Sequence, residues 1–120
     1  MSLQLIDLGR DVEFIPVDVD TMPCTFAVEL DDKTFVFTFA YNEVGDFFTC
    51  DLETPEGDVL ARGDVIRYGR PLFGPIEDER FPLPVIIPQC LSGEDVSVVT
   101  YENFGNLVKL YLHPRQVATP

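Results

Sequence analysis

The 120-residue sequence has few of the side chains from which catalytic and transition-metal sites are built. It contains no tryptophan and a single histidine, His113. One imidazole cannot supply the two or more histidine ligands of many transition-metal sites, and no oriented partner is indicated that would make it a general base. The G-x-S-x-G, Walker and G-x-G-x-x-G motifs are also absent. The sequence therefore predicts no catalytic residue, no metal ligand and no cofactor.

The cysteines are also few, and their spacing excludes the usual frameworks. Cys24, Cys50 and Cys90 are odd in number and contain no C-x-x-C pair, which favours neither a disulfide scaffold nor a zinc site. The opening residues lack the pattern of a secretory signal, and no apolar run reaches the roughly 18 to 20 residues that cross a bilayer. We expect reduced core thiols in a soluble protein made in a reducing cytoplasm.

Basic residues are scarce as well. The chain has 8 lysines and arginines against 21 acidic residues, which gives a formal net charge of -13. The phosphates of nucleic acids and the headgroups of anionic membranes would repel such a chain, so direct binding to either is not expected. Basic protein surfaces are the partners that this charge favours.

What the sequence does have is a strongly alternating aromatic segment. Large side chains recur at every second position between residues 33 and 41, which is the period of a β-strand. A five-residue turn, Asn42 to Asp46, leads into a second alternating segment at residues 46–53. With a half-buried strand at residues 24–30, these segments predict a three-strand antiparallel meander. Its inner face is formed by Phe35, Phe37, Phe39, Tyr41, Phe48, Cys50 and Leu52.

The rest of the chain is predicted to continue in short strands. These are expected at residues 12–17, 59–68, 85–91, 96–101 and 107–113, with a bulge or bend at Gly63 and an interruption at Pro88. Seven or eight strands without a sustained helical period indicate an all-β fold, a small antiparallel β-sandwich or open barrel. We expect one domain over residues 1–120, with an N-terminal arm at 1–11 and a C-terminal tail at 114–120.

One irregular segment, residues 70–88, is predicted to be a long loop. It carries five prolines and an acidic run that ends in an arginine. Loops of this length in a compact domain are usually functional or ordered by a partner, so we place the candidate protein interface here. Its apolar anchors and charges would be Phe73, Glu77, Asp78, Glu79, Phe81 and Leu83.

Three alternative functions depend on features that sequence alone leaves open. The aromatic row could be the stacking platform of a carbohydrate-binding β-sandwich, although core packing is favoured because a sheet without tryptophan fills its interior with other aromatic rings. Asp18 and Asp20 could hold a hard cation, although solvated turn carboxylates are favoured. A hydrolase of unrecognised type would need acidic residues that converge in a cleft.

Several short motifs, taken together, resemble one known family. They lie at residues 14–16 (F-I-P), 25–30, 33–42, 51–52, 57, 103–105 (N-F-G) and 108–111. In this arrangement the chain resembles the small baseplate plug proteins of tailed bacteriophages, known from contractile-tailed cyanophage particles. The resemblance covers roughly residues 12 to 113. The sequence departs from the family pattern mainly at residues 70–88 and 115–120, where contacts particular to this particle are expected.

The resemblance implies a structural role in the virion. A member of this family would be a non-enzymatic component of the tail baseplate, made in the host bacterial cytoplasm and packed near the tail axis. Its partners would be the hub, tube-initiator and spike proteins, in a ring of threefold or sixfold symmetry. No catalytic residues are transferred by the resemblance.

Overall fold

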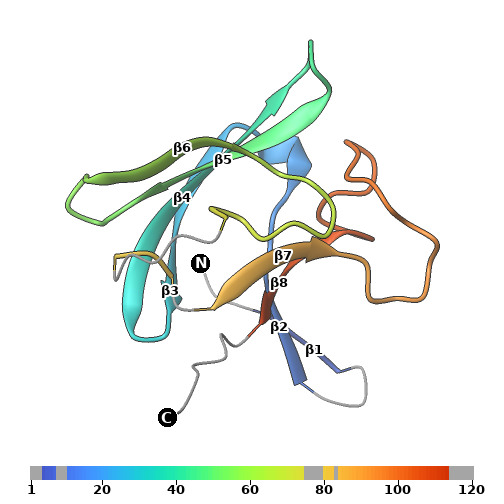
Figure 1. Cartoon of the computed structure of the whole chain (residues 1–120), viewed down its shortest axis with the longest axis horizontal. Coiled ribbons are helices and arrows are strands. Elements are labelled where there is room, and N and C mark those ends of the chain that lie inside the picture. The colour runs from blue at the N-terminus through green and yellow to red at the C-terminus, as the bar shows by residue number, and fades with distance from the viewer. Residues whose placement is uncertain (1–3, 8–10, 75–79, 83, 114–120) are drawn as a thin grey trace.

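The computed structural model describes residues 4–7, 11–74, 80–82 and 84–113, and these residues form two antiparallel sheets (Figure 1). The strands are β1 (Gln4–Asp7), β2 (Asp11–Ile15), β3 (Cys24–Leu30), β4 (Lys33–Asn42), β5 (Phe47–Glu53), β6 (Val59–Val65), β7 (Val85–Gln89) and β8 (Lys109–His113). A short 3-10 turn, η1 (Val19–Thr21), precedes β3. The predicted all-β fold is confirmed, with an open arrangement of two sheets. None of the described helical residues forms a segment that could span a membrane.

The first sheet is the meander predicted from the alternating aromatics. Its order is β3-β4-β5-β6, so each strand pairs with its neighbour in sequence. Phe37 lies opposite Phe26 on one side and opposite Leu52 on the other. Short turns connect the strands, and Asp31, Asp32 and Asp46 adopt positive φ values of 54°, 69° and 57° in them. Aspartate is one of the few residue types that tolerate this conformation, so the residues in the turns are compatible with the observed register of the strands.

β6 contains the irregularity that was predicted at Gly63. Its pairing with β5 passes from Cys50 opposite Asp64 to Leu52 opposite Ala61, which leaves one extra residue in β6. Gly63 has a φ of +67°, and its amide donates to the Asp51 carboxylate at 2.7 Å. The bulge is therefore stabilised by a side chain of the neighbouring strand, and β6 ends at Val65 rather than at Tyr68.

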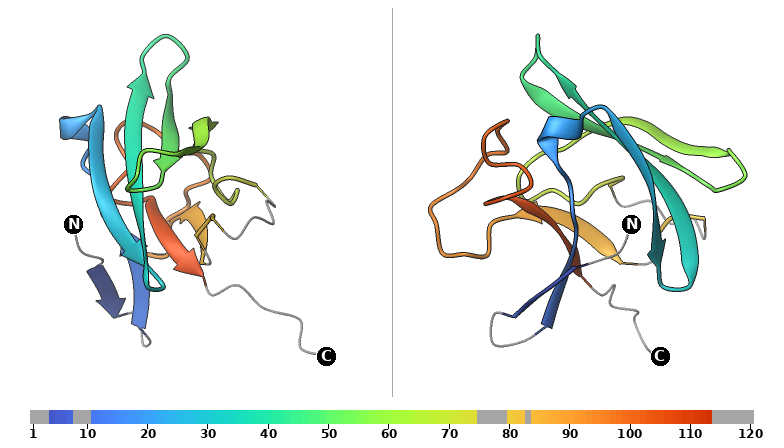
Figure 2. Two further views of the ribbon diagram at one scale, coloured as in Figure 1. Left: turned by 90° about the vertical axis from the view of Figure 1, so that its left-hand side faces the viewer. Right: turned by 180° about the vertical axis from the view of Figure 1, so that it is seen from behind.

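The second sheet joins the two ends of the chain. Its order is β1-β2-β8-β7, so the last strand lies between β7, which precedes it in the sequence, and β2 from the opposite end of the chain (Figure 2). Residues 4–7, predicted to be part of an arm, form an edge strand that pairs with β2. Pro88 lies within β7, the opposite edge strand. An edge strand tolerates proline because its outer side needs no amide donor.

β8 is more buried than its alternation suggested. Tyr111 alternates with Leu110 and Leu112, so it lies on the opposite face of the strand, yet it is buried and meets Phe14 edge-to-face at 6.0 Å between ring centroids. Lys109 Nζ lies 4.5 Å from the centre of the Phe14 ring, a cation–π arrangement. Burial raises the pKa of Tyr111. His113, in the same phase, is half-buried and shares a 2.7 Å hydrogen bond with Gln89 Oε1 of β7.

The strand predicted at residues 96–101 is wrong, because this segment lies outside both sheets. The Asn103 side chain instead forms hydrogen bonds with the backbone of this segment. The Asn103 side chain accepts from the Thr100 amide at 2.8 Å and donates to the Val98 carbonyl at 3.0 Å. β-branched residues fit a pleated surface only where a strand is present to pair with them. Here a side-chain amide satisfies the backbone and holds the segment in a turn.

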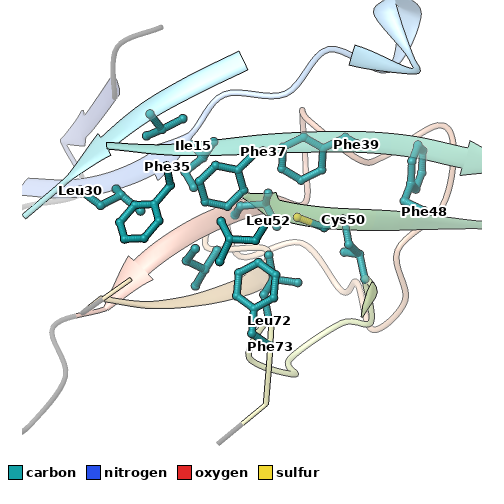
Figure 3. Packing of buried hydrophobic residues seen from close by; sticks show 14 of the residues in the cluster. Ile15, Leu30, Phe35, Phe37, Phe39, Phe48, Cys50, Leu52, Leu72 and Phe73 are labelled. Carbon is teal, nitrogen blue, oxygen red and sulfur yellow. The ribbon is translucent and has the colours of Figure 1, made fainter. Parts of the chain in front are cut away.

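The core lies between the sheets and combines phenylalanine rings with aliphatic side chains (Figure 3). The Phe37 and Phe39 rings of β4 stack with nearly parallel planes, and their centroids are 5.9 Å apart. Phe48 of β5 packs on Phe104, from the loop before β8, at 4.6 Å. Ile15 and Leu110 contribute from the second sheet. Residues from both ends of the sequence therefore enclose one aromatic layer.

The cysteines differ in burial, which predicts an order of chemical modification. Cys50 is fully buried, and desolvation raises the pKa of its thiol well above the ordinary value. Cys90 lies nearer the surface, and the Ser92 hydroxyl, 3.2 Å from its sulfur, lowers its pKa. A thiol reagent at neutral pH is therefore expected to modify Cys90 first and Cys50 only after unfolding. Peptide mass spectrometry over time measures this order. Equal rates for Cys50 and Cys90 in the folded protein would contradict it.

Candidate protein interface

The predicted interface lies in the segment between β6 and β7, and its first anchor faces inward. Phe73 is 8 % exposed and packs on Phe37 at 6.4 Å and on Phe81 at 5.8 Å between ring centroids. It is therefore part of the core of this chain (Figure 3). Phe81 is half-buried against it. The other four candidates, Glu77, Asp78, Glu79 and Leu83, lie outside the described residues.

Asp64 secures this inward turn, a role that the sequence did not indicate. Its Oδ2 atom accepts a hydrogen bond from the Phe73 amide at 2.7 Å. Phe73 has a φ of +66°, an unfavourable conformation for a residue with a side chain. The carboxylate and the burial of the ring together stabilise that conformation. A strand residue followed, nine positions later, by an aromatic residue gives no periodic signal by which this pair could have been found.

The turn between β4 and β5 is held by its own side chains. The Gly45 amide donates to Asn42 Oδ1 at 2.9 Å, and the Asp46 amide donates to the Asn42 carbonyl at 2.8 Å. The Tyr41 hydroxyl donates to Asp46 Oδ1 at 2.5 Å. An added Cβ at Gly45 would lie only 2.2 Å from the Phe47 ring, so the turn leaves no room for a side chain there. The tip of the hairpin is therefore a defined structure.

Acidic side chains gather around Tyr41. The hydrogen bond to Asp46 is the main cause that raises the pKa of Tyr41 to about 12, and the charges of Asp46, Glu102 and Glu43 add to it. The folded chain holds this proton more tightly than an unfolded chain, in which the ordinary value of 10.0 applies. The stabilisation is fully present below the ordinary value and is lost as the pH rises toward 12.

Replacing Asp46 with asparagine is expected to lower the pKa of Tyr41, since a neutral partner no longer opposes the phenolate. Asparagine tolerates the positive φ of position 46, so the turn should persist. The ultraviolet absorbance of tyrosinate during alkaline titration measures the change. Tyr41→Phe identifies which of the four tyrosines is observed. An unchanged titration curve in Asp46→Asn would show that Asp46 is not the controlling partner.

The geometry removes the basis for the carbohydrate-binding alternative. Phe35, Phe37 and Phe39 are 2 %, 0 % and 0 % exposed, so their faces are covered by the chain itself and cannot stack on a sugar. Asp18 caps η1 by accepting from the Asp20 amide at 2.9 Å, as a turn carboxylate does. Among the described residues there is no cluster of three histidine, cysteine or acidic side chains with the geometry of a metal site.

Comparison with known protein families identifies the family of the chain. Residues 12–115 match the family described as cyanophage baseplate Pam3 plug gp18. The chain belongs to this baseplate plug family. The match agrees with the resemblance of its short motifs and extends over most of the chain. Neither the curated proteins nor the solved structures gave a match.

Membership of the plug family establishes the general role of the chain. It is a structural component of a phage baseplate, it is located in the tail of the virion, and it associates with other tail proteins. The family is a structural plug that is not known as an enzyme.

The most distinctive motif of the resemblance, N-F-G at residues 103–105, has a structural role in this plug. Asn103 holds the preceding segment through the hydrogen bonds described above, and its amide donates to Thr100 Oγ1 at 3.1 Å. Phe104 is buried on Phe48. Gly105 has a φ of +92° and passes close to the carbonyl of Val17. The motif thus attaches the loop before β8 to the core.

Proposed function

We propose that this plug lies near the tail axis of the baseplate, between the tube-initiator and the hub or spike proteins. The observation that carries the proposal is the match to the plug family over residues 12–115. The fold is consistent with a space-filling role, because the aromatic row of β4, Phe35, Phe37 and Phe39, is buried in the core. Its large negative charge favours neighbours with basic surfaces.

The copies are proposed to form a ring with threefold or sixfold symmetry. In a closed ring one contact between two different surfaces repeats around the axis, so a small adaptor needs to present two such surfaces. Residues 70–88 remain a proposed contact for one of them, with the half-buried Phe81 as one anchor. Glu77, Asp78 and Glu79, which precede it in the sequence, would supply the charge. The chain would be made in the host bacterial cytoplasm and incorporated during tail assembly.

Quantitative mass spectrometry of purified tails tests this proposal. The chain should be present in every preparation of intact tails, at a constant ratio to the hub protein that fits threefold or sixfold symmetry. It should remain there when the tails are washed at high salt concentration. Its presence in the infected cell but absence from purified tails would instead indicate an assembly factor, and would contradict the proposal.

A further inference from the structure

Exposed apolar side chains gather at one end of the plug. In the described part of the chain the exposed large hydrophobic residues are Val44, Val59, Val98, Tyr101 and Leu107. Val44 is 100 % exposed at the tip of the β4–β5 hairpin, which projects beyond the body of the molecule (Figure 1). The other three, apart from Val59, come from the loop between β7 and β8. Single exposed hydrophobic residues are ordinary, but a group of them at a projecting end indicates an interaction surface.

Direct contacts join this loop to the hairpin. The Tyr101 ring lies 4.9 Å from the Tyr41 ring and 6.2 Å from the Phe48 ring, centre to centre, and is still 39 % exposed. A groove of about 330 Å³ lies beside this contact, lined by Asp46 and Phe47 of the hairpin, by residues 65–68 at the end of β6 and by residues 97–99 of the loop. We define the tip surface as Val44, Tyr101 and Val98 together with this groove.

The charge of the tip surface is negative. Glu43 and Asp46 lie in the hairpin turn beside Val44, where Asp46 accepts from the Tyr41 hydroxyl, and Glu102 follows Tyr101 in the loop that packs on Tyr41. Arg67 is the one basic side chain among the described residues that line the groove. Apolar groups surrounded by carboxylates match a partner that offers an apolar socket bordered by lysine and arginine.

We propose that the tip surface is the site where the plug docks on a basic baseplate protein of a different kind, with Val44 inserted in an apolar socket. The local charge selects a basic partner over the same surface of a second copy, because the carboxylates of the hairpin turn would then face like charges. The hydrogen-bonded turn presents Val44 in a fixed position, so little conformational entropy is lost on docking. This inference rests on the proposed function and specifies one of its contacts.

One part of the predicted loop interface, at Arg80, lies far from the hairpin tip. Arg80 of that loop lines a groove with Lys33 and Thr34, at the start of β4. β4 has ten residues, so its start and the hairpin tip are about 30 Å apart. The two surfaces can therefore contact two different neighbours, as an adaptor requires.

The test uses a phage whose own copy of the gene is inactivated and which is supplied with variants from a plasmid. Val44→Asp and Glu43→Lys are expected to lower incorporation into purified tails about tenfold or more. The first variant places a charge in the apolar socket, and the second places a positive charge against the basic border of the partner. Val59→Asp and Glu29→Lys are matched controls, since both residues are exposed and lie away from the tip. They should be incorporated as the unmodified chain is.

A photo-reactive amino acid at position 44 identifies the neighbour. The expected product is a cross-link in assembled tails to a different tail protein, at a segment that contains lysine or arginine. Three results would overturn the inference: normal incorporation of Val44→Asp and Glu43→Lys, a cross-link to another copy of the plug, or a cross-link to an acidic segment. If the unmodified chain is itself missing from tails, the proposed function fails. If it is present and the tip variants are too, only this docking site fails.

Discussion

Replacing Phe37 with alanine is expected to lower the free energy of unfolding by about 3–5 kcal/mol. The ring is completely buried at the centre of β4 and packs on Phe39 and Phe73. Its removal loses apolar burial and leaves a cavity between two sheets whose strands cannot easily close around it. Urea denaturation monitored by circular dichroism measures the loss.

A milder substitution and a surface control make this prediction precise. Phe37→Leu should cost less than Phe37→Ala, since leucine fills much of the cavity, and it remains measurable if the alanine variant is largely unfolded. Thr34→Ala, exposed on the same strand, should cost under about 1 kcal/mol. Equal losses of unfolding free energy for Phe37→Ala and Thr34→Ala would show that Phe37 is not enclosed between the sheets. The aromatic row would then have to be exposed on the surface.

Gly105→Ala is expected to destabilise the plug much more than Gly57→Ala. Both glycines have a similar backbone conformation, with φ values of +92° and +98°. The conformational cost of a side chain, about 1–2 kcal/mol, is therefore shared by the two variants. At Gly57 an added Cβ meets no atom within 4 Å, whereas at Gly105 it would lie 2.4 Å from the Val17 carbonyl oxygen.

The difference between the two variants isolates the close approach at Gly105. Because the obstructing atom belongs to the backbone, the loop before β8 must move, at an additional cost of about 1–3 kcal/mol. Urea denaturation of the two variants under the same conditions gives this difference directly. Equal midpoints would mean that the N-F-G segment is not attached to the chain at Val17.

The first sheet could be predicted from sequence because its signals are local. The aromatic row and the five-residue turn at Asn42 determine strand, partner and register within 21 residues, and the observed bounds of β4 and β5 differ from the predicted ones by one residue at most. The second sheet depends on pairing between the two ends of the chain. Local alternation could not show that Tyr111 would be covered on the outer phase of β8.

The failures at the candidate interface have the same origin. The segment at 96–101 has the composition of a strand, but the Asn103 side chain bonds to its backbone at Val98 and Thr100, and none of the described strands pairs with it. Phe73 was expected to be an interface anchor because it lies in the proline-rich segment. Instead its amide donates to the Asp64 carboxylate and its ring is buried in the core. Composition identified a long segment without predicting which of its side chains would join the core. The tip surface was missed because Tyr41 and Tyr101 are 60 positions apart and come into contact only in the folded chain.

Electron cryo-microscopy of the intact tail tests most directly whether the chain is a baseplate plug. The account predicts that density for the two four-stranded sheets lies near the tail axis, repeated by threefold or sixfold symmetry, with the β4–β5 hairpin inserted in a basic neighbouring protein. Density for this fold outside the baseplate, or a complete baseplate axis that does not contain it, would contradict the account.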